Sequence, residues 1–165
     1  MSPTQTPPTL QLVTNAYDSR RDTQDHINRV RQLIAGFVVA LLERGEAHDA
    51  SKLGEPEKSI FDRVVPELGE LTFGTAEYAA ALDKLRPALD HHYADNRHHP
   101  EHFPLTGVAG MNLLDLVEMV IDWKAASERQ HQALDLAHLF QRFAIDHQLA
   151  AIIRNTALDL DWRTK

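Results

Sequence analysis

The chain has 165 residues, of which 43% are hydrophobic, and its formal net charge is −7. Such a length and composition predict one compact domain with enough apolar side chains for a core. The absence of cysteine excludes a disulfide scaffold, a thiolate metal site and a cysteine nucleophile. Lysine and arginine are scattered rather than clustered, so we expect no nucleic-acid groove.

The first nine residues are rich in proline and threonine and lack the basic and apolar regions of a signal peptide. They predict a disordered lead-in over residues 1–9, followed by a single domain over residues 10–165. The longest apolar run, residues 33–42, is about half of the roughly 20 residues that a membrane-spanning helix needs. We therefore expect a cytoplasmic protein with no membrane segment.

Helical periodicity dominates the first half of the chain. Residues 23–44 carry apolar side chains along one broad stripe, with Asp22 as a candidate cap and Gly45 as a candidate end. A loop is expected from there to residue 54, after which Pro56 suits a first helical position. Thr75 can cap a further helix, which Pro87 is expected to kink or restart.

The second half also predicts helices. Prolines and glycines between residues 100 and 110 predict a loop, and helices are then expected over residues 112–129, 131–143 and 147–159. Asp146 is positioned to cap the last of them. Since no stretch alternates with a period of two, the predicted fold is all-α, a bundle of about six helices. The apolar faces of the last two helices suit a core or a homodimer equally.

A histidine cluster is the most informative feature, because five of the ten histidines fall within residues 91–102. Imidazole is the commonest protein ligand for transition metals, and carboxylates complete such sites. The cluster therefore predicts a centre of one or two divalent ions, drawn from Mn, Fe, Co, Ni or Zn. The alternative is a histidine-rich surface loop with adventitious affinity for metal.

Helical-wheel reasoning separates some of these histidines. His92 and Asn96 follow the apolar side of the preceding helix, whereas His91 projects oppositely, so His92 is the expected inward residue. Because a proline follows, the helix must be ending, and the wheel leaves open whether His98, His99 or His102 are ligands.

Further candidate ligands lie upstream. The dipeptide His48-Asp49 offers a nitrogen and an oxygen, and Lys52 follows as a cation for an anionic substrate or as a plain surface residue. His26 lies on the apolar stripe of the first helix. It is either a ligand or a core histidine hydrogen-bonded to a carbonyl.

Acidic residues complete the candidate set. Glu57 is expected on the packed side of its helix. There it either binds the metal or orients a metal ligand. The alternative is a first-turn acid that the helix dipole stabilises. Asp115, Glu118 and Asp122 recur along one stripe of a strongly apolar helix, which could also be its solvated face. Asp122 is of most interest because it precedes a tryptophan.

In chain order, a histidine, then HDASK, then a late aspartate in DWKAA resemble the H…HD…D pattern of the HD superfamily of metal-dependent phosphohydrolases. The segments HDASKLGEPE, HHYADNRHHPEHF and MNLLDLVEMVIDWKAAS resemble more closely a family of small bacterial and phage proteins of unknown function. That resemblance covers most of the chain. Residues 96–102 depart from the HD pattern, because HD hydrolases do not generally carry this run.

The HD resemblance implies a metal enzyme that hydrolyses a small phosphomonoester or nucleotide with a metal-activated water. The expected first ligands are His26, His48, Asp49 and Asp122. The expected ligands of a second ion are His92, His98 and His99. Lys52, Arg97 and Lys124 would neutralise phosphate, with Asn96 beside the substrate. Glu57 or Glu118 would take the proton of the water or orient a ligand histidine. A di-iron oxygenase and a non-catalytic, metal-stabilised interaction module are the alternatives.

Overall fold

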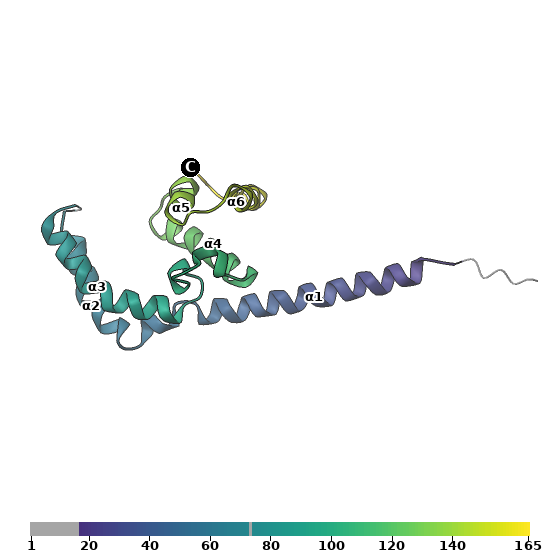
Figure 1. Cartoon of the computed structure of the whole chain (residues 1–165), viewed down its shortest axis with the longest axis horizontal. Helices are drawn as coiled ribbons and strands as arrows, with labels where there is room; N and C mark the ends of the chain where they lie inside the picture. The colour runs from purple at the N-terminus through teal and green to yellow at the C-terminus, as the bar shows by residue number, and fades with distance from the viewer. Residues whose placement is uncertain (1–16, 73) are drawn as a thin grey trace, which may run out of the picture. The chain divides into compact units, whose positions relative to one another are not determined.

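The computed structural model describes residues 17–72 and 74–165, whose regular structure consists of six α-helices and three short 3₁₀ helices (Figure 1). In these ranges β-structure is limited to an isolated bridge between Leu134 and Thr164. The all-α prediction is therefore confirmed. The expected lead-in over residues 1–9 lies outside the described residues. No helix in the described part of the chain is long and apolar enough to cross a membrane.

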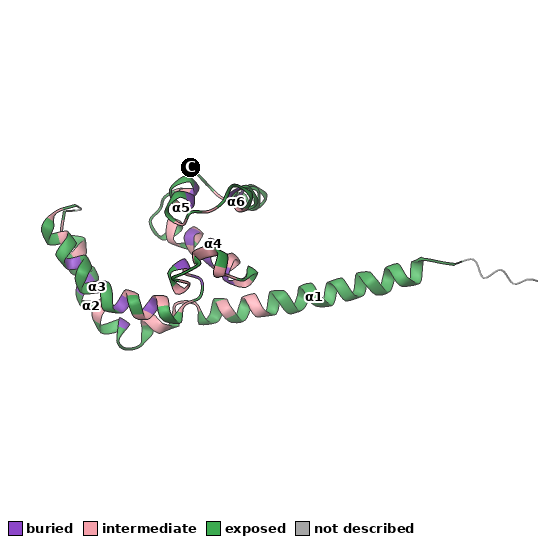
Figure 2. Ribbon diagram, viewed as in Figure 1, coloured by how far each residue is buried: buried purple, intermediate pink, exposed green. Residues whose placement is uncertain are grey.

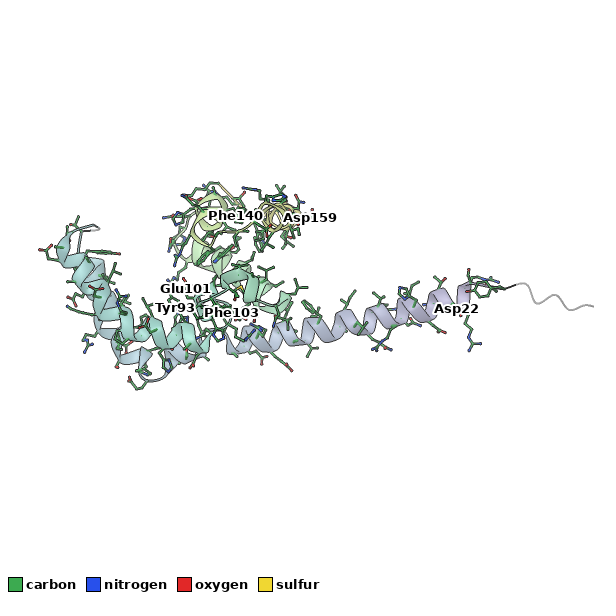
Figure 3. The ribbon with its side chains drawn as sticks, in the orientation of Figure 1. Asp22, Tyr93, Glu101, Phe103, Phe140 and Asp159 are labelled. Atoms are coloured by element: carbon green, nitrogen blue, oxygen red, sulfur yellow. The ribbon has the colours of Figure 1, made fainter. Side chains whose placement is uncertain are left out.

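The chain divides into two units, residues 1–38 and residues 39–165, and each is described by itself. The first contains most of α1, Arg20–Ala47. Its apolar side chains, among them Ile27 and Leu33, are exposed (Figure 2). Asp22 is not the cap that the sequence predicted but lies in the first turn, where its carboxylate accepts a hydrogen bond from the hydroxyl of Tyr17 at 2.6 Å (Figure 3).

The second unit begins with the last turns of α1, which continue past the predicted end at Gly45. A glycine inside a helix costs only about 1 kcal/mol relative to alanine, so it does not by itself end one. The 3₁₀ helix η1, Ala50–Leu53, follows and leads into α2, Glu57–Glu70. Pro56 lies just before this helix, as its cap residue, rather than at its first position.

Helix α2 packs along α3, Ala76–Asp95, and the two helices run side by side (Figure 1). The pair buries the apolar side chains of Val64 and Leu85, among others. The hydroxyl oxygen of Thr75 accepts a hydrogen bond from the backbone of α3 at 3.2 Å, as the sequence predicted. Pro87 lies inside α3, so it does not restart the helix.

Helices α4 (Leu113–Arg129), α5 (Leu136–Arg142) and α6 (His147–Asp159) enclose the apolar core of this unit. Each helix contributes buried side chains to that core, including Met119, Phe140 and Ile153. Phe140 is labelled in Figure 3.

The boundaries of two of these helices agree with prediction. Asn112 caps α4 in a reciprocal capping box with Asp115, and the side chain of Asp146 caps α6. By contrast, α5 begins at Leu136 rather than His131. The reason is the backbone of His131, whose φ of 55° is left-handed and interrupts the helical path.

Candidate metal centre

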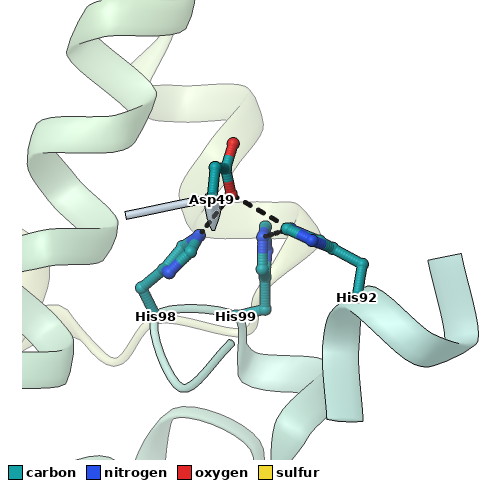
Figure 4. A group of neighbouring side chains, drawn as sticks. All are labelled: Asp49, His92, His98 and His99. Carbon is teal, nitrogen blue, oxygen red and sulfur yellow. Dashed lines mark hydrogen bonds and ion pairs between the residues drawn. The ribbon is translucent and has the colours of Figure 1, made fainter. Parts of the chain in front are cut away.

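Four potential ligand atoms converge in the second unit, all within 4.8 Å of one another. Asp49 immediately precedes η1, His92 lies in the last turn of α3, and His98 and His99 lie in the short loop before the 3₁₀ helix Pro100–His102 (Figure 4). Asp49 Oδ1 lies 3.2 Å from His92 Nε2 and 3.5 Å from His98 Nε2, and His92 Nε2 lies 2.9 Å from His99 Nε2. Ligands held at about 2.1 Å from one ion stand about 3 to 3.5 Å apart, so this spacing suits a transition metal.

Two of these atoms make no hydrogen bond within the described residues. Both Asp49 Oδ1 and His98 Nε2 are buried and lack a hydrogen-bond partner. A buried polar atom without a partner costs about 1–3 kcal/mol, and such costs usually indicate a missing ion or water. A cation bound between an aspartate oxygen and an imidazole nitrogen 3.5 Å apart satisfies both at once. The residues therefore fit a divalent ion with nitrogen and oxygen ligands.

A second group of ligand atoms adjoins the first. It comprises His48, His98 and Asp122, and the distance between His48 Nε2 and Asp122 Oδ1 is 3.6 Å. His98 belongs to both groups. Its Nδ1 lies 3.1 Å from Glu118 Oε1, which leaves Nε2 for a metal. Because one ring nitrogen binds one ion, His98 can complete only one of the two groups at a time.

The carboxylate of Glu57 fixes the orientation of the His92 ring through Nδ1, the ring nitrogen that does not face the ligand group. Glu57 is fully buried, and its two oxygens lie 2.8 Å from His91 Nδ1 and 3.0 Å from His92 Nδ1. A carboxylate can only accept hydrogen bonds, so Nδ1 of His92 carries the proton and Nε2 keeps its lone pair for a ligand. His92 is buried and His91 is partly exposed, in agreement with the wheel prediction.

Glu118 acts in the same way on two other histidines. Its Oε1 lies 3.0 Å from His48 Nδ1 and 3.1 Å from His98 Nδ1, and its Oε2 accepts a hydrogen bond from Arg44 Nε at 2.7 Å. These contacts favour the orienting role over the proton-accepting role for Glu118. The same holds for Glu57, because both of its oxygens face imidazoles.

Asp115 anchors this arrangement one turn earlier in α4. Fully buried, it accepts hydrogen bonds from Arg44 Nη2 at 2.6 Å, Arg97 Nη2 at 2.9 Å and the backbone of Asn112 at 2.9 Å. The acidic stripe of α4 is thus an inner face, and the solvated-face alternative is wrong for Asp115 and Glu118. Sequence reasoning missed Arg44, although the capping-box spacing from Asn112 could have indicated a structural role for Asp115.

The electrostatic surroundings set unusual protonation states in the metal-free protein. The carboxylates of Asp122 and Glu118 raise the pKa of His48 to about 9, against the opposing effect of burial. Burial, together with the neighbouring imidazoles of the cluster, lowers the pKa of His99 to about 3. His99 is therefore neutral and offers a lone pair, as a metal ligand must. Although burial opposes it, contact with His92 and Lys52 lowers the pKa of Asp49 below its ordinary value.

These shifts predict how the stability of metal-free protein depends on pH. The folded-state pKa of His48 is raised, so its stabilising contribution is complete below about pH 6.5 and is lost as the pH rises toward 9. The pKa of His99 is depressed, so its contribution is present above about pH 6.5 and is lost toward pH 3. The melting temperature of chelator-treated protein should therefore be highest between these two pH ranges and should fall toward pH 3 and toward pH 9. In His48→Gln, the fall in melting temperature toward pH 9 should be smaller. An unchanged fall in that variant would show that His48 does not cause it.

A cavity of about 410 Å³ opens beside the ligand groups. His99 and Asp122 contribute to its wall, together with Tyr93, Arg142 and Lys165. The ring of Tyr93 contacts that of His99, with their centroids 5.0 Å apart. Ligand pockets typically measure about 300–1,000 Å³, so the cavity has room for a small organic molecule next to the candidate ion.

The remaining predicted substrate residues lie elsewhere in the second unit. Asn96 donates hydrogen bonds to the Ser51 hydroxyl and the His92 carbonyl, both at 2.8 Å. Arg97 pairs with Asp115, and Lys124 pairs with Glu128 at 2.5 Å. None of Asn96, Arg97 and Lys124 contributes to the wall of the 410 Å³ cavity. Sequence reasoning missed Arg142 and Lys165, which do, and no motif marks either residue.

His26 and His102, two candidates from the sequence, belong to neither ligand group. His26 is exposed on α1 in the first unit, and its role as a ligand stays a prediction. His102 directs Nδ1 to the backbone carbonyl of Tyr93 at 3.0 Å. The structure thus gathers His48, Asp49 and the downstream histidines of the prediction.

Comparison with known proteins supplies a family but no activity. No curated protein and no solved structure matches the chain. Nothing in the comparisons ties it to the HD superfamily, so that link remains a proposal. A family model described as a family of unknown function, DUF5662, matches residues 15–159. With most of its length covered, the chain belongs to this family of unknown function.

Proposed function

We propose that this protein is a divalent-metal-dependent phosphohydrolase that acts on a small phosphomonoester or nucleotide. The observation that carries the proposal is the pair of buried, unpartnered atoms Asp49 Oδ1 and His98 Nε2, beside a cavity of about 410 Å³. The ligand group of Asp49, His92, His98 and His99 is the more complete of the two, so it is the proposed metal site.

A divalent transition ion in this group supplies a water of lowered pKa and polarises a phosphoryl oxygen. The chain itself provides the positioning. Glu57 and Glu118 hold the imidazoles through Nδ1, which directs their Nε2 atoms toward the common centre. Asp122 lines the cavity and lies outside the four-residue group, where its carboxylate can accept a proton from the attacking water.

The charge of the cavity wall supports an anionic substrate. Arg142 and Lys165 both line the cavity, and each lies at 3.3 Å or more from its paired carboxylate. Such long pairs can open to receive a phosphate group. Trp123 and Phe143, stacked with centroids 5.4 Å apart, give the same wall a flat apolar section for the organic part of the substrate.

The test is a phosphatase screen over nucleotides and small phosphomonoesters with untagged protein. Chelated protein should be inactive, and Mn, Co, Ni or Fe should restore turnover. Asp49→Asn should lose both metal binding and turnover by at least about 100-fold, because it removes a charged ligand. Asp62→Asn is the matched control, since Asp62 is an exposed carboxylate paired with Lys58, and it should behave as wild type.

The alternatives predict other outcomes of the same screen. A non-catalytic module predicts that metal raises the melting temperature while no compound turns over. A di-iron oxygenase predicts turnover with iron alone and none toward phosphoesters. Either result would overturn the hydrolase proposal while keeping the metal site. The oxygenase is disfavoured because both ligand groups include His98. Its Nδ1 lies 3.1 Å from Glu118, which leaves Nε2 for one ion.

A further inference from the structure

Asp49 uses its two oxygens for different purposes. Oδ1 faces His92 and His98 at 3.2 and 3.5 Å and makes no hydrogen bond within the described residues. Oδ2 accepts a hydrogen bond from Lys52 Nζ at 2.6 Å and lies 3.7 Å from His48 Nε2. One carboxylate thus faces a candidate metal position on one side and a fixed ammonium group on the other.

The second ligand group is incomplete once the first is filled. An ion bound by the first group uses the lone pair of His98 Nε2, which leaves only His48 Nε2 and Asp122 Oδ1, 3.6 Å apart, for a second ion. A third protein ligand must come from nearby, and Asp49 Oδ2 is within 3.7 Å of His48 Nε2. That oxygen is already bound to the ammonium of Lys52.

The local fold holds Lys52 in this position. Its backbone N–H donates to the carbonyl of Asp49 at 2.9 Å, which closes the first turn of η1 and brings the two side chains to one side. Nζ also lies 6.0 Å from the ring centroid of Phe61, within the range of a cation–π contact. A divalent ion on Asp49 Oδ2 would therefore be repelled by the positive charge of Lys52, which the local fold holds in place.

We infer that the centre takes a single divalent transition ion and that the ammonium of Lys52 stands in for a second one by occupying Asp49 Oδ2. Neutralising Lys52 then converts a one-ion centre into a two-ion centre. The inference rests on the metal site of the proposed function but not on the reaction, because it concerns ion count alone.

The test measures cobalt(II) stoichiometry in untagged protein by calorimetric titration and by elemental analysis after desalting. Wild type should bind one ion per chain, and Lys52→Met should bind two. Lys52→Gln, which keeps a hydrogen-bond donor but no charge, is the second variant should the methionine impair folding, as judged by circular dichroism. Lys58→Met, which removes an exposed lysine paired with Asp62, is the control and should bind one ion.

A double variant tests where the additional ion binds. Lys52→Met with Asp122→Asn should return to one ion, because the second position then loses a carboxylate. Two ions in wild type, or one ion in both Lys52 variants, would overturn the inference and leave the proposed function standing. No bound ion in wild type would instead remove the metal site, and with it the proposed function.

Discussion

In the variant His98→Ala, cobalt(II) or zinc(II) affinity should fall by far more than about 100-fold. A residue that only orients a ligand typically contributes about 10–100-fold to affinity, and His98 offers a ligand atom directly. Its side chain is only 2% exposed, and His98 belongs to both ligand groups. Calorimetric titration of metal-free protein measures the change.

The matched control is His102→Ala, from the same histidine cluster. His102 contacts the backbone carbonyl of Tyr93 and the ring of Phe103 and belongs to neither ligand group, so this variant should bind metal as wild type does. Equal losses in both variants would show that the cluster binds metal adventitiously at its surface. A wild-type affinity in His98→Ala would refute the site outright.

In the variant Asp115→Ala, the free energy of unfolding should fall by about 3 kcal/mol. Removing one partner of a buried ion pair costs about 3–5 kcal/mol, and the lower end applies because Arg44 and Arg97 are partly exposed. The variant also removes one half of the α4 capping box. Urea unfolding of metal-free protein gives the value.

Asp62→Ala is the control for this second variant. Its pair with Lys58 is exposed, and exposed pairs contribute at most about 1 kcal/mol. A loss in Asp115→Ala no larger than that of the control would mean that Asp115 does not anchor Arg44 and Arg97. In that case Arg44, no longer held by Asp115, would also lose its assigned role of positioning Glu118 through their hydrogen bond.

The local features of this protein were the predictable ones. Helical period and capping chemistry act within a few residues. For this reason the bounds of α6 and the caps Thr75 and Asp146 agree with prediction. The helical wheel also identified His92, rather than His91, as the buried histidine. The wheel could not decide whether His98 or His99 is a ligand, because both residues follow the end of α3. Both belong to the same ligand group.

The long-range features could not be predicted from patterns. The ion pair between Arg44 and Asp115 joins residues 71 positions apart, and a helical wheel describes one helix at a time. Arg142 reaches the cavity wall from α5, far in sequence from every motif. The order of motifs and the helical wheel suggested His26 as a ligand, and that role stays a prediction.

Anomalous diffraction from crystals grown with zinc tests the central claim most directly, because it locates each bound ion. The account predicts one ion at about 2.0–2.2 Å from Asp49 Oδ1 and from the Nε2 atoms of His92, His98 and His99. Zinc found only on histidines outside the two ligand groups, such as His102, with Asp49 and His98 still without a common ion, would contradict it.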